Sequence, residues 1–134
     1  MFPKYQRLNT KDVLFLTKKK TYFSYGFFGF FFINQYSNRN YNQISFHVSI
    51  KYDKNATARN VLKRAVIKQA ETLTKKGLLA KHQKIFITLN KNKLPLLQKE
   101  FEKMEKKNII LRIQNYFTQS FTALSKHLGN SSAI

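Results

Sequence analysis

The longest apolar stretch of the chain, residues 22–33, is rich in aromatic side chains and predicts a strand. Aromatic residues occupy both of its faces, so we expect this strand to be central in a sheet and covered on both sides. Gly26 and Gly29 interrupt the run and indicate points where another backbone or a ligand approaches closely. The next residues, 34–42, are polar and predict a loop.

Residues 43–52 alternate between apolar and polar side chains, which is typical of a half-buried strand. The apolar face carries Ile44, Phe46, Val48 and Ile50. The polar face carries Ser45, His47, Ser49 and Lys51. We expect this strand to pair with the aromatic strand before it, in a hairpin or meander.

A long amphipathic helix is predicted for residues 58–76, with Thr57 as its N-cap and Gly77 just past its end. Its apolar stripe has helical spacing: Ala58, Leu62, Ala65, Val66, Ala70 and Leu73. Its other face is basic and polar: Arg59, Asn60, Lys63, Arg64 and Lys68. Because like charges four residues apart weaken an isolated helix, this face indicates a negatively charged partner. A merely solvated face is the alternative.

The remaining pattern predicts shorter elements. They are a helix at 11–19 after an N-cap at Thr10, a strand at 84–89, a helix from Leu94, a short strand at 109–113 and a last amphipathic helix at 115–128. We expect Val13 and Leu16 to face the core from the first helix.

The charge of the chain is far from balanced. Among 134 residues there are 25 Lys and Arg against 6 Asp and Glu, which gives a formal net charge of +19. Such a chain repels itself unless an anionic partner neutralises it, and a nucleic-acid backbone is the commonest such partner. An anionic membrane surface is the alternative, although no apolar run reaches the ~20 residues that span a bilayer.

Other features bear on the cellular location of the protein and on the kinds of site that it can form. The chain has no cysteine, which excludes disulfides and thiolate metal sites, and its first residues lack the layout of a signal peptide. We therefore expect a soluble cytoplasmic protein with no membrane partner and no small-molecule substrate.

The acidic residues are too few and too scattered for a protein-only nuclease, which needs clustered carboxylates to hold metal ions. They are Asp12, Asp53, Glu71, Glu100, Glu102 and Glu105. The three histidines, His47, His82 and His127, stand far apart, and there is no Gly-rich phosphate loop or nucleophile elbow. We predict no catalytic residue, so any chemistry must come from another component.

Two segments carry a family resemblance. Residues 48–51 (Val-Ser-Ile-Lys) and 56–64 (Ala-Thr-Ala-Arg-Asn-Val-Leu-Lys-Arg) resemble the protein component of bacterial ribonuclease P. That family carries a strand ending in Val-Ser-Lys-Lys, a short turn and a helix that opens with an Arg-Asn-Arg motif. The order of elements is similar, and so is Arg7-Leu8 before a first helix that contains Asp12. The resemblance covers residues 7–107.

The resemblance implies a fold, and it implies that the protein binds RNA while an RNA subunit performs the cleavage. The fold is a small two-layer α/β sandwich of order α-β-β(-β)-α-β-α, similar to the second domain of ribosomal protein S5, with an extra C-terminal helix. Residues 1–107 would form the RNA-binding domain, and residues 108–134 a C-terminal extension with a frayed tail. The protein would bind ribonuclease P RNA and the 5′ leader of precursor tRNA as the accessory subunit of an endoribonuclease. The RNA, which holds most of the Mg²⁺, would cleave the phosphodiester.

The same resemblance assigns site residues. RNA contacts are implied for Lys54, Arg59, Asn60, Lys63, Arg64 and Lys68. The leader cleft is implied for Ser49, Lys51, His47 and Phe15. The chain departs from the family at Val61, where the motif has its second arginine, and at Val13 and Thr17, where the family has phenylalanines that face the cleft.

Two other functions fit the same features. A structural RNA-binding protein of the ribosomal type is the first alternative, because small basic α/β domains are common there. A stand-alone nuclease is the second, and the shortage of acidic residues argues against it.

Overall fold

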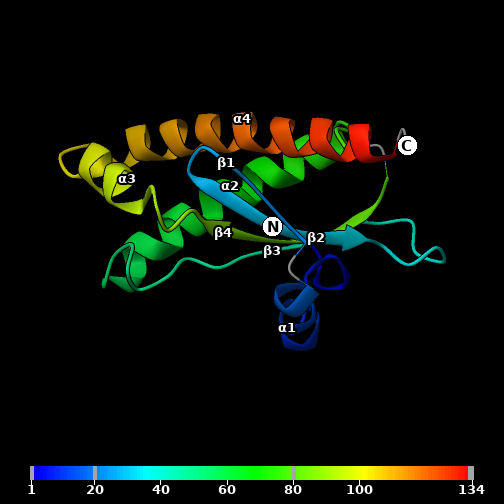
Figure 1. Cartoon of the computed structure of the whole chain (residues 1–134). Helices are drawn as coiled ribbons and strands as arrows, with labels where there is room; N and C mark the ends of the chain where they lie inside the picture. The colour runs from blue at the N-terminus through cyan, green and yellow to red at the C-terminus, as the bar shows by residue number, and fades with distance from the viewer. Residues whose placement is uncertain (1, 20, 80, 133–134) are drawn as a thin grey trace.

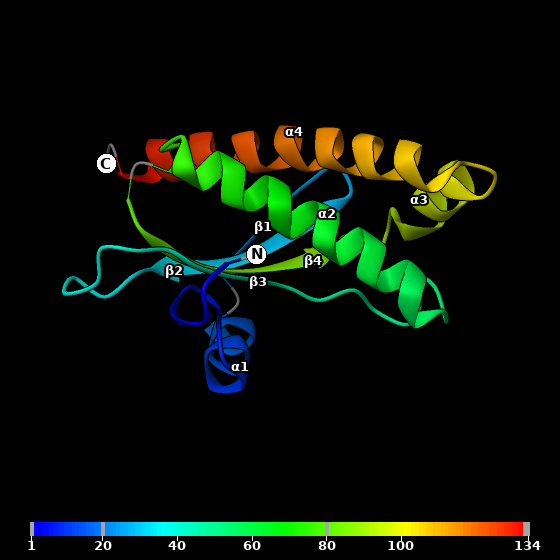
Figure 2. The ribbon, with the colours of Figure 1, turned by 180° about the vertical axis from the view of Figure 1, so that it is seen from behind.

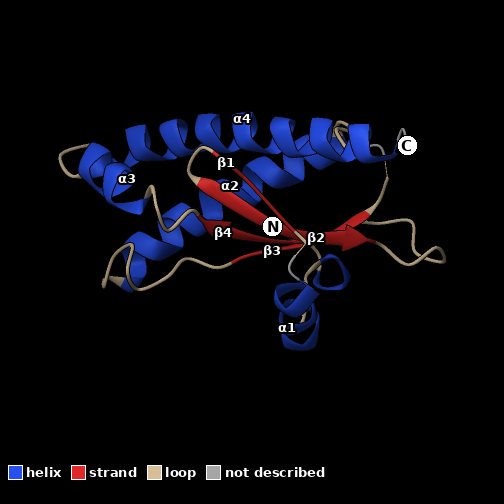
Figure 3. Ribbon diagram, viewed as in Figure 1, coloured by secondary structure: helices blue, strands red, loops and turns tan. Residues whose placement is uncertain are grey.

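The computed structural model describes residues 2–19, 21–79 and 81–132. The chain forms a four-stranded sheet with helices on both faces (Figure 1). In chain order the elements are η1 (Lys4–Gln6), α1 (Thr10–Lys19), β1 (Tyr22–Tyr25), β2 (Phe28–Asn34), β3 (Gln43–Phe46), α2 (Ala56–Lys75), β4 (Gln83–Leu89), α3 (Leu94–Phe101) and α4 (Lys106–Ser132). The α/β class and the order α-β-β(-β)-α-β-α with an extra C-terminal helix, which the family resemblance implied, are confirmed (Figure 3).

The aromatic run forms a hairpin rather than the single strand that we predicted. Gly26 has a φ of +60° in the turn between β1 and β2, a conformation that glycine adopts without strain. The chain then reverses, and Tyr22 pairs with Phe31. Both arms of the hairpin are aromatic, so composition alone hides the turn. At Gly29, where we expected another backbone or a ligand to approach closely, the neighbour is instead the Tyr22 side chain, which leaves no room for a Cβ.

The sheet has the strand order β1-β2-β4-β3, so the predicted central place of the aromatic strand is confirmed for β2. β4 runs antiparallel to β2 and parallel to β3. The prediction that residues 43–52 pair with the aromatic strand is therefore wrong. That segment is a strand only to Phe46, and Ile50, expected on the apolar face, is 66% exposed. A parallel neighbour requires a long crossover, which α2 supplies.

Helices α2 and α4 cover one face of the sheet, and α1 lies against the other (Figures 1 and 2). The core lies between the sheet and the two long helices. Its largest fully buried members include Phe28, Phe30, Leu62, Ile85, Ile87, Ile113, Phe117, Phe121 and Leu124. None of the helices within the described ranges is long and apolar enough to cross a membrane.

Residues 109–113 belong to α4, so the short strand predicted there is wrong. Ile109 and Ile113 continue the four-residue spacing of Phe117 and Phe121, so a single helix places all four on one side, where Ile109 is partly buried and the other three are fully buried. The predicted helix at 115–128 is confirmed as the later part of this longer helix. The segment that we assigned to an extension, 108–134, thus contributes side chains to the same core as the sheet.

The ends of the helices differ slightly from the predictions. The backbone N–H of Thr57 donates to Asn55 Oδ1 at 2.9 Å, so Asn55 and not Thr57 is the N-cap of α2. Likewise, Asn9 Oδ1 accepts from the N–H of Asp12 at 2.8 Å, where we had predicted Thr10 as the cap of α1. Gly77, with a φ of +73°, follows the last turn of α2 as predicted.

Candidate nucleic-acid interface

A cavity of about 750 Å³ lies between α2, β3 and the segment before α1. Its floor is apolar and includes Phe2, Ile44, Phe46 and Ile67. Its rim is mostly basic and polar, with Arg7, Ser45, Asn60, Lys63, Arg64, Lys68, Thr72 and Lys75, and it includes one acidic residue, Glu71, which pairs with Lys75 at 3.4 Å. We call this site the α2–β3 cavity. Four of the six residues expected to contact RNA, those from Asn60 to Lys68, are brought together here.

The amphipathic pattern of α2 is the reason that these side chains face outward. Its predicted stripe is confirmed, with Leu62, Ala65, Val66, Ala70 and Leu73 all buried. Burial of this stripe turns the Lys63, Arg64 and Lys68 side chains to solvent. Three cations therefore stand on one exposed helix face beside the cavity.

Val61 points to a different part of the molecule. It lines a second cavity, of about 560 Å³, together with Phe101, Met104 and Ile109 of the C-terminal part. A valine suits these apolar neighbours, which accounts for the departure from the arginine of the family motif. Tyr52 lines the same cavity, where burial, and next the charge of Asp53, raise its pKa to about 12. Its phenol is therefore neutral near pH 7.

The other two residues of the expected RNA-binding set lie at the start of α2, outside the α2–β3 cavity. Arg59 Nη1 donates to the carbonyl oxygens of Asp53 and Lys54 at 2.8 and 2.9 Å. This guanidinium therefore holds the turn against the helix. The Lys54 side chain is exposed.

The four residues expected in a leader cleft are not gathered at the α2–β3 cavity. His47 is exposed directly after β3, and its N–H donates to the carbonyl of Ile87 at 3.2 Å. Ser49 Oγ accepts from the N–H of Lys51 at 3.1 Å within a turn. Phe15 is 47% exposed on α1, across the sheet from α2, with Lys19 Nζ 5.4 Å from its ring centre.

Several residues at these surfaces escaped prediction. Arg7 and Ser45 reach the α2–β3 cavity from distant parts of the chain. On the sheet face that α1 partly covers, the Phe31 ring lies 4.8 Å from Tyr22 and 6.3 Å from Phe86 between ring centres. Only the strand register, which is not encoded locally, places these three rings side by side.

The described residues hold no group of three or more His, Cys, Asp or Glu that could bind a metal ion. Among the described residues, three carboxylates form ion pairs with cations: Asp12 with Lys84 at 3.0 Å, Glu100 with Arg112 at 2.8 Å and Glu71 with Lys75 at 3.4 Å. Within the described ranges, therefore, no cluster of these side chains could hold a Mg²⁺ ion.

Comparison with known proteins identifies the fold. No family model and no curated protein matches the sequence. Among solved structures, the RNase P protein of Staphylococcus aureus is 19% identical, with a TM-score of 0.65, over 89% of this chain and 94% of that one. The RNase P protein of Thermotoga maritima is 24% identical, with a TM-score of 0.60, over 84% of this chain and 96% of that one.

A third structure agrees with these two. A mutant of the S. aureus RNase P protein with defective mRNA degradation activity is 20% identical, with a TM-score of 0.67, over 90% of this chain and 89% of that one. The similarity extends over more of the chain than residues 7–107, which carry the sequence resemblance. The chain therefore has the fold of the bacterial RNase P protein over most of its length.

Proposed function

We propose that this chain is the protein subunit of a ribonuclease P. In this proposal it binds the catalytic RNA and the 5′ leader of precursor tRNA, and so assists the 5′ maturation of tRNA in the cytoplasm. The observation that carries the proposal is the α2–β3 cavity, whose basic rim belongs to a fold shared with bacterial RNase P proteins.

The chemistry of the cavity suits an RNA backbone. Lys63, Arg64 and Lys68 come from α2, and Arg7 joins them from the N-terminal segment. Cations gathered on a concave surface neutralise neighbouring phosphates and release their counterions, which is the main source of affinity for nucleic acids. The amide of Asn60 can hydrogen-bond to a sugar or a base edge. If the basic face of α2 were only solvated, there would be no reason for a further cation, Arg7, to lie beside it.

We assign the leader to the sheet face beside α1. The rings of Tyr22, Phe31 and Phe86 are available there for stacking on unpaired bases, and Phe15 on α1 offers a further exposed ring. Ser49, Lys51 and His47 follow β3 and would contact the leader backbone. This arrangement replaces the phenylalanines that the family has at the positions of Val13 and Thr17.

We further propose that the RNA subunit performs the cleavage and holds the Mg²⁺. The scattered carboxylates support this division, because a hydrolytic metal site needs several of them in one place. The protein then contributes by binding, which raises the local concentration of substrate at the ribozyme.

The test is reconstitution with the ribonuclease P RNA of the same organism, at low Mg²⁺ and with precursor tRNA. Wild-type protein should stimulate cleavage, and the double variant Lys63→Ala/Arg64→Ala should stimulate it less. The salt dependence of RNA binding should also flatten, by about 0.7–0.9 in the slope of log K against log salt for each lost phosphate contact.

A matched control removes two exposed lysines from α4, in the double variant Lys107→Ala/Lys126→Ala. This control changes the net charge equally but leaves the α2–β3 cavity intact. Failure of the wild-type protein to stimulate its own RNA would refute the proposal. Association with ribosomes and no effect on the ribozyme would favour a ribosomal role instead.

A further inference from the structure

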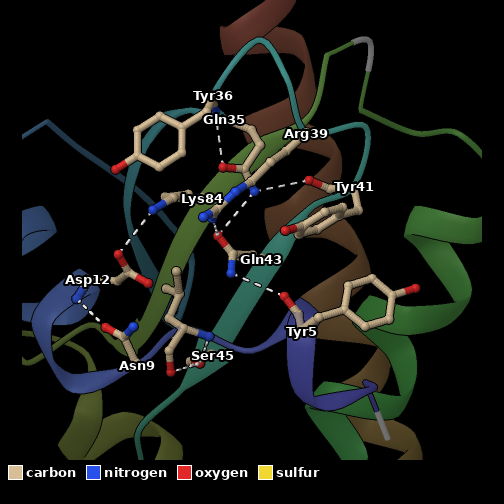
Figure 4. Close-up of polar contacts among 11 residues, drawn as sticks. Tyr5, Asn9, Asp12, Gln35, Tyr36, Arg39, Tyr41, Gln43, Ser45 and Lys84 are labelled. Atoms are coloured by element: carbon tan, nitrogen blue, oxygen red, sulfur yellow. Dashed lines mark hydrogen bonds and ion pairs between the residues drawn. The ribbon is translucent and has the colours of Figure 1, made fainter.

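The loop between β2 and β3 presents aromatic rings and an arginine at the surface, outside the lining of the α2–β3 cavity. Tyr36, Arg39 and Tyr41 come from this loop, and Tyr5 joins them from η1 (Figure 4). We call these four residues the tyrosine–arginine cluster. Tyr5 is 57% exposed and Tyr36 is 52% exposed, so each keeps more than half of its surface in contact with solvent.

The members of the cluster contact one another closely. The guanidinium carbon of Arg39 lies 4.9 Å from the ring centre of Tyr36 and 6.0 Å from that of Tyr41. The rings of Tyr5 and Tyr41 meet edge to face, with 5.0 Å between their centres. The cluster is therefore a continuous surface of three rings and one planar cation.

Two buried glutamines hold this surface in place. Gln43 Oε1 accepts from Gln35 Nε2 and from Arg39 Nη1, both at 3.1 Å. Gln43 Nε2 donates to the carbonyl of Tyr5, also at 3.1 Å. Gln35 binds the backbone of the two remaining members, donating to the carbonyl of Tyr41 and accepting from the N–H of Tyr36. Every member of the cluster is thus hydrogen-bonded to a buried amide.

These hydrogen bonds hold the backbone of the three tyrosines and the guanidinium of Arg39 in place before any ligand binds. Gln35 and Gln43 are 8% and 7% exposed, so water competes little for their hydrogen bonds. Lys84 adds a further constraint, because its ammonium lies 4.3 Å from the Tyr36 ring centre and is fixed by Asp12. A preorganised surface loses little conformational entropy on binding. A cluster that served only to close the loop would bury its rings.

We propose that the tyrosine–arginine cluster binds unpaired RNA bases by stacking, as a second contact surface apart from α2. The inference rests on the proposed function and specifies the ligand as single-stranded RNA. Aromatic rings and guanidinium planes stack on any base, since every base has a π face. Within the described part of the chain, the guanidinium of Arg39 donates only through Nη1, so its other N–H groups can reach a phosphate.

The position of the cluster suits a strand that also crosses the α2–β3 cavity. Tyr5 is two residues before Arg7, which lines that cavity. The N–H of Leu8 donates to Ser45 Oγ at 3.0 Å, and Ser45 lines the cavity as well. The segment from Tyr5 to Leu8 therefore connects the two surfaces along the edge strand β3.

The test measures the binding of labelled ten-nucleotide oligouridylate and oligoadenylate by fluorescence anisotropy. The double variant Tyr5→Leu/Tyr36→Leu should bind about 5-fold or more weakly for each ring removed, with the salt slope unchanged because no charge is lost. Tyr36→Phe, which keeps the ring, should bind like the wild type. Tyr25→Leu is the matched control, because Tyr25 is 51% exposed on β1 and lies outside the cluster.

The outcomes separate this inference from the proposed function. Equal affinity of the double variant and the Tyr25→Leu control would overturn the inference, whereas stimulation of the ribozyme would still support the function. Loss of affinity in the tyrosine variants, with an unchanged salt slope in Lys63→Ala/Arg64→Ala, would keep the cluster and refute the role of α2. If circular dichroism shows the double variant to be unfolded, Tyr5→Leu alone decides the matter, because that ring is the more exposed.

Discussion

Lys84 is a charged residue in β4 that is only 3% exposed. Its ammonium pairs with Asp12 Oδ1 at 3.0 Å and lies against the Tyr36 ring. A buried charge is costly unless it is paired and hydrogen-bonded, so this contact fastens α1 to the sheet. Asp12 and Lys84 are 72 residues apart in sequence. The first-turn position of Asp12 is visible in the sequence, but its partner is not.

Replacing Asp12 by alanine should therefore lower the free energy of unfolding by about 3 kcal/mol, because it leaves an unpaired ammonium in the sheet. Urea denaturation measures this change. The double variant Asp12→Ala/Lys84→Met should recover much of the loss, since it removes both charges. Glu102→Ala, which removes an exposed carboxylate, is the control. A loss no larger than that of this control would show that the ion pair contributes nothing to stability.

At the scale of the elements, the contacts at the start of α2 determine where its basic face lies. Asn55 caps the helix, and Arg59 binds the two preceding carbonyl oxygens. Together they set the direction in which the basic face leaves the turn. We predicted Thr57 as the N-cap, but Asn55, two positions earlier, is by residue type an equally good cap. Only the backbone conformation decides between them.

Asn55→Ala should lower the free energy of unfolding by about 1 kcal/mol, the usual effect of losing an N-cap side chain. Thr57→Ala should change it much less, because its side chain makes no capping bond. Thermal unfolding of the two variants, followed by circular dichroism, compares them directly. The reverse order of stabilities would mean that α2 begins at Thr57 in solution.

The elements also show what the sequence could predict. Helix α2 and the later part of α4 carry a helical period, so their buried stripes and the basic face of α2 were evident, whereas the short apolar run at 109–113 suits a strand as well as a helix. The turn at Gly26 was hidden because both arms of the hairpin are aromatic. The partner of β3 was not predictable, since alternation specifies which side chains are buried but not which strand is adjacent. For the same reason Arg7 and Ser45 could not be assigned to the α2–β3 cavity.

At the scale of the whole molecule, α4 completes the core instead of extending it. Ile113, Phe117, Phe121 and Leu124 are each fully buried. Gln69 Nε2 of α2 donates to Thr118 Oγ1 at 2.8 Å, and Gln114 Nε2 of α4 donates to the carbonyl of Ala65 at 3.1 Å. The helix that carries the basic face therefore depends on α4 for its position.

Truncation after Lys107 should abolish cooperative unfolding. Each Phe→Ala change in a core typically costs about 3–5 kcal/mol, and a domain has only about 5–15 kcal/mol in total. Calorimetry of the truncated chain should show no unfolding transition. Leu111→Ala, at a position that is 66% exposed, should unfold like the full-length protein. A cooperative transition in the truncated chain would establish residues 1–107 as an independent domain.

The strand order has a consequence for synthesis on the ribosome. β4 lies between β2 and β3, yet both of these strands are made before it. β2 ends at Asn34 and β4 begins at Gln83, so about 49 residues are added in between, which takes roughly 3–10 s at ~5–20 residues per second. Throughout that interval one edge of a phenylalanine-rich strand is unpaired, a state prone to aggregation. The positive charge that suits RNA also makes nascent copies repel one another during this interval.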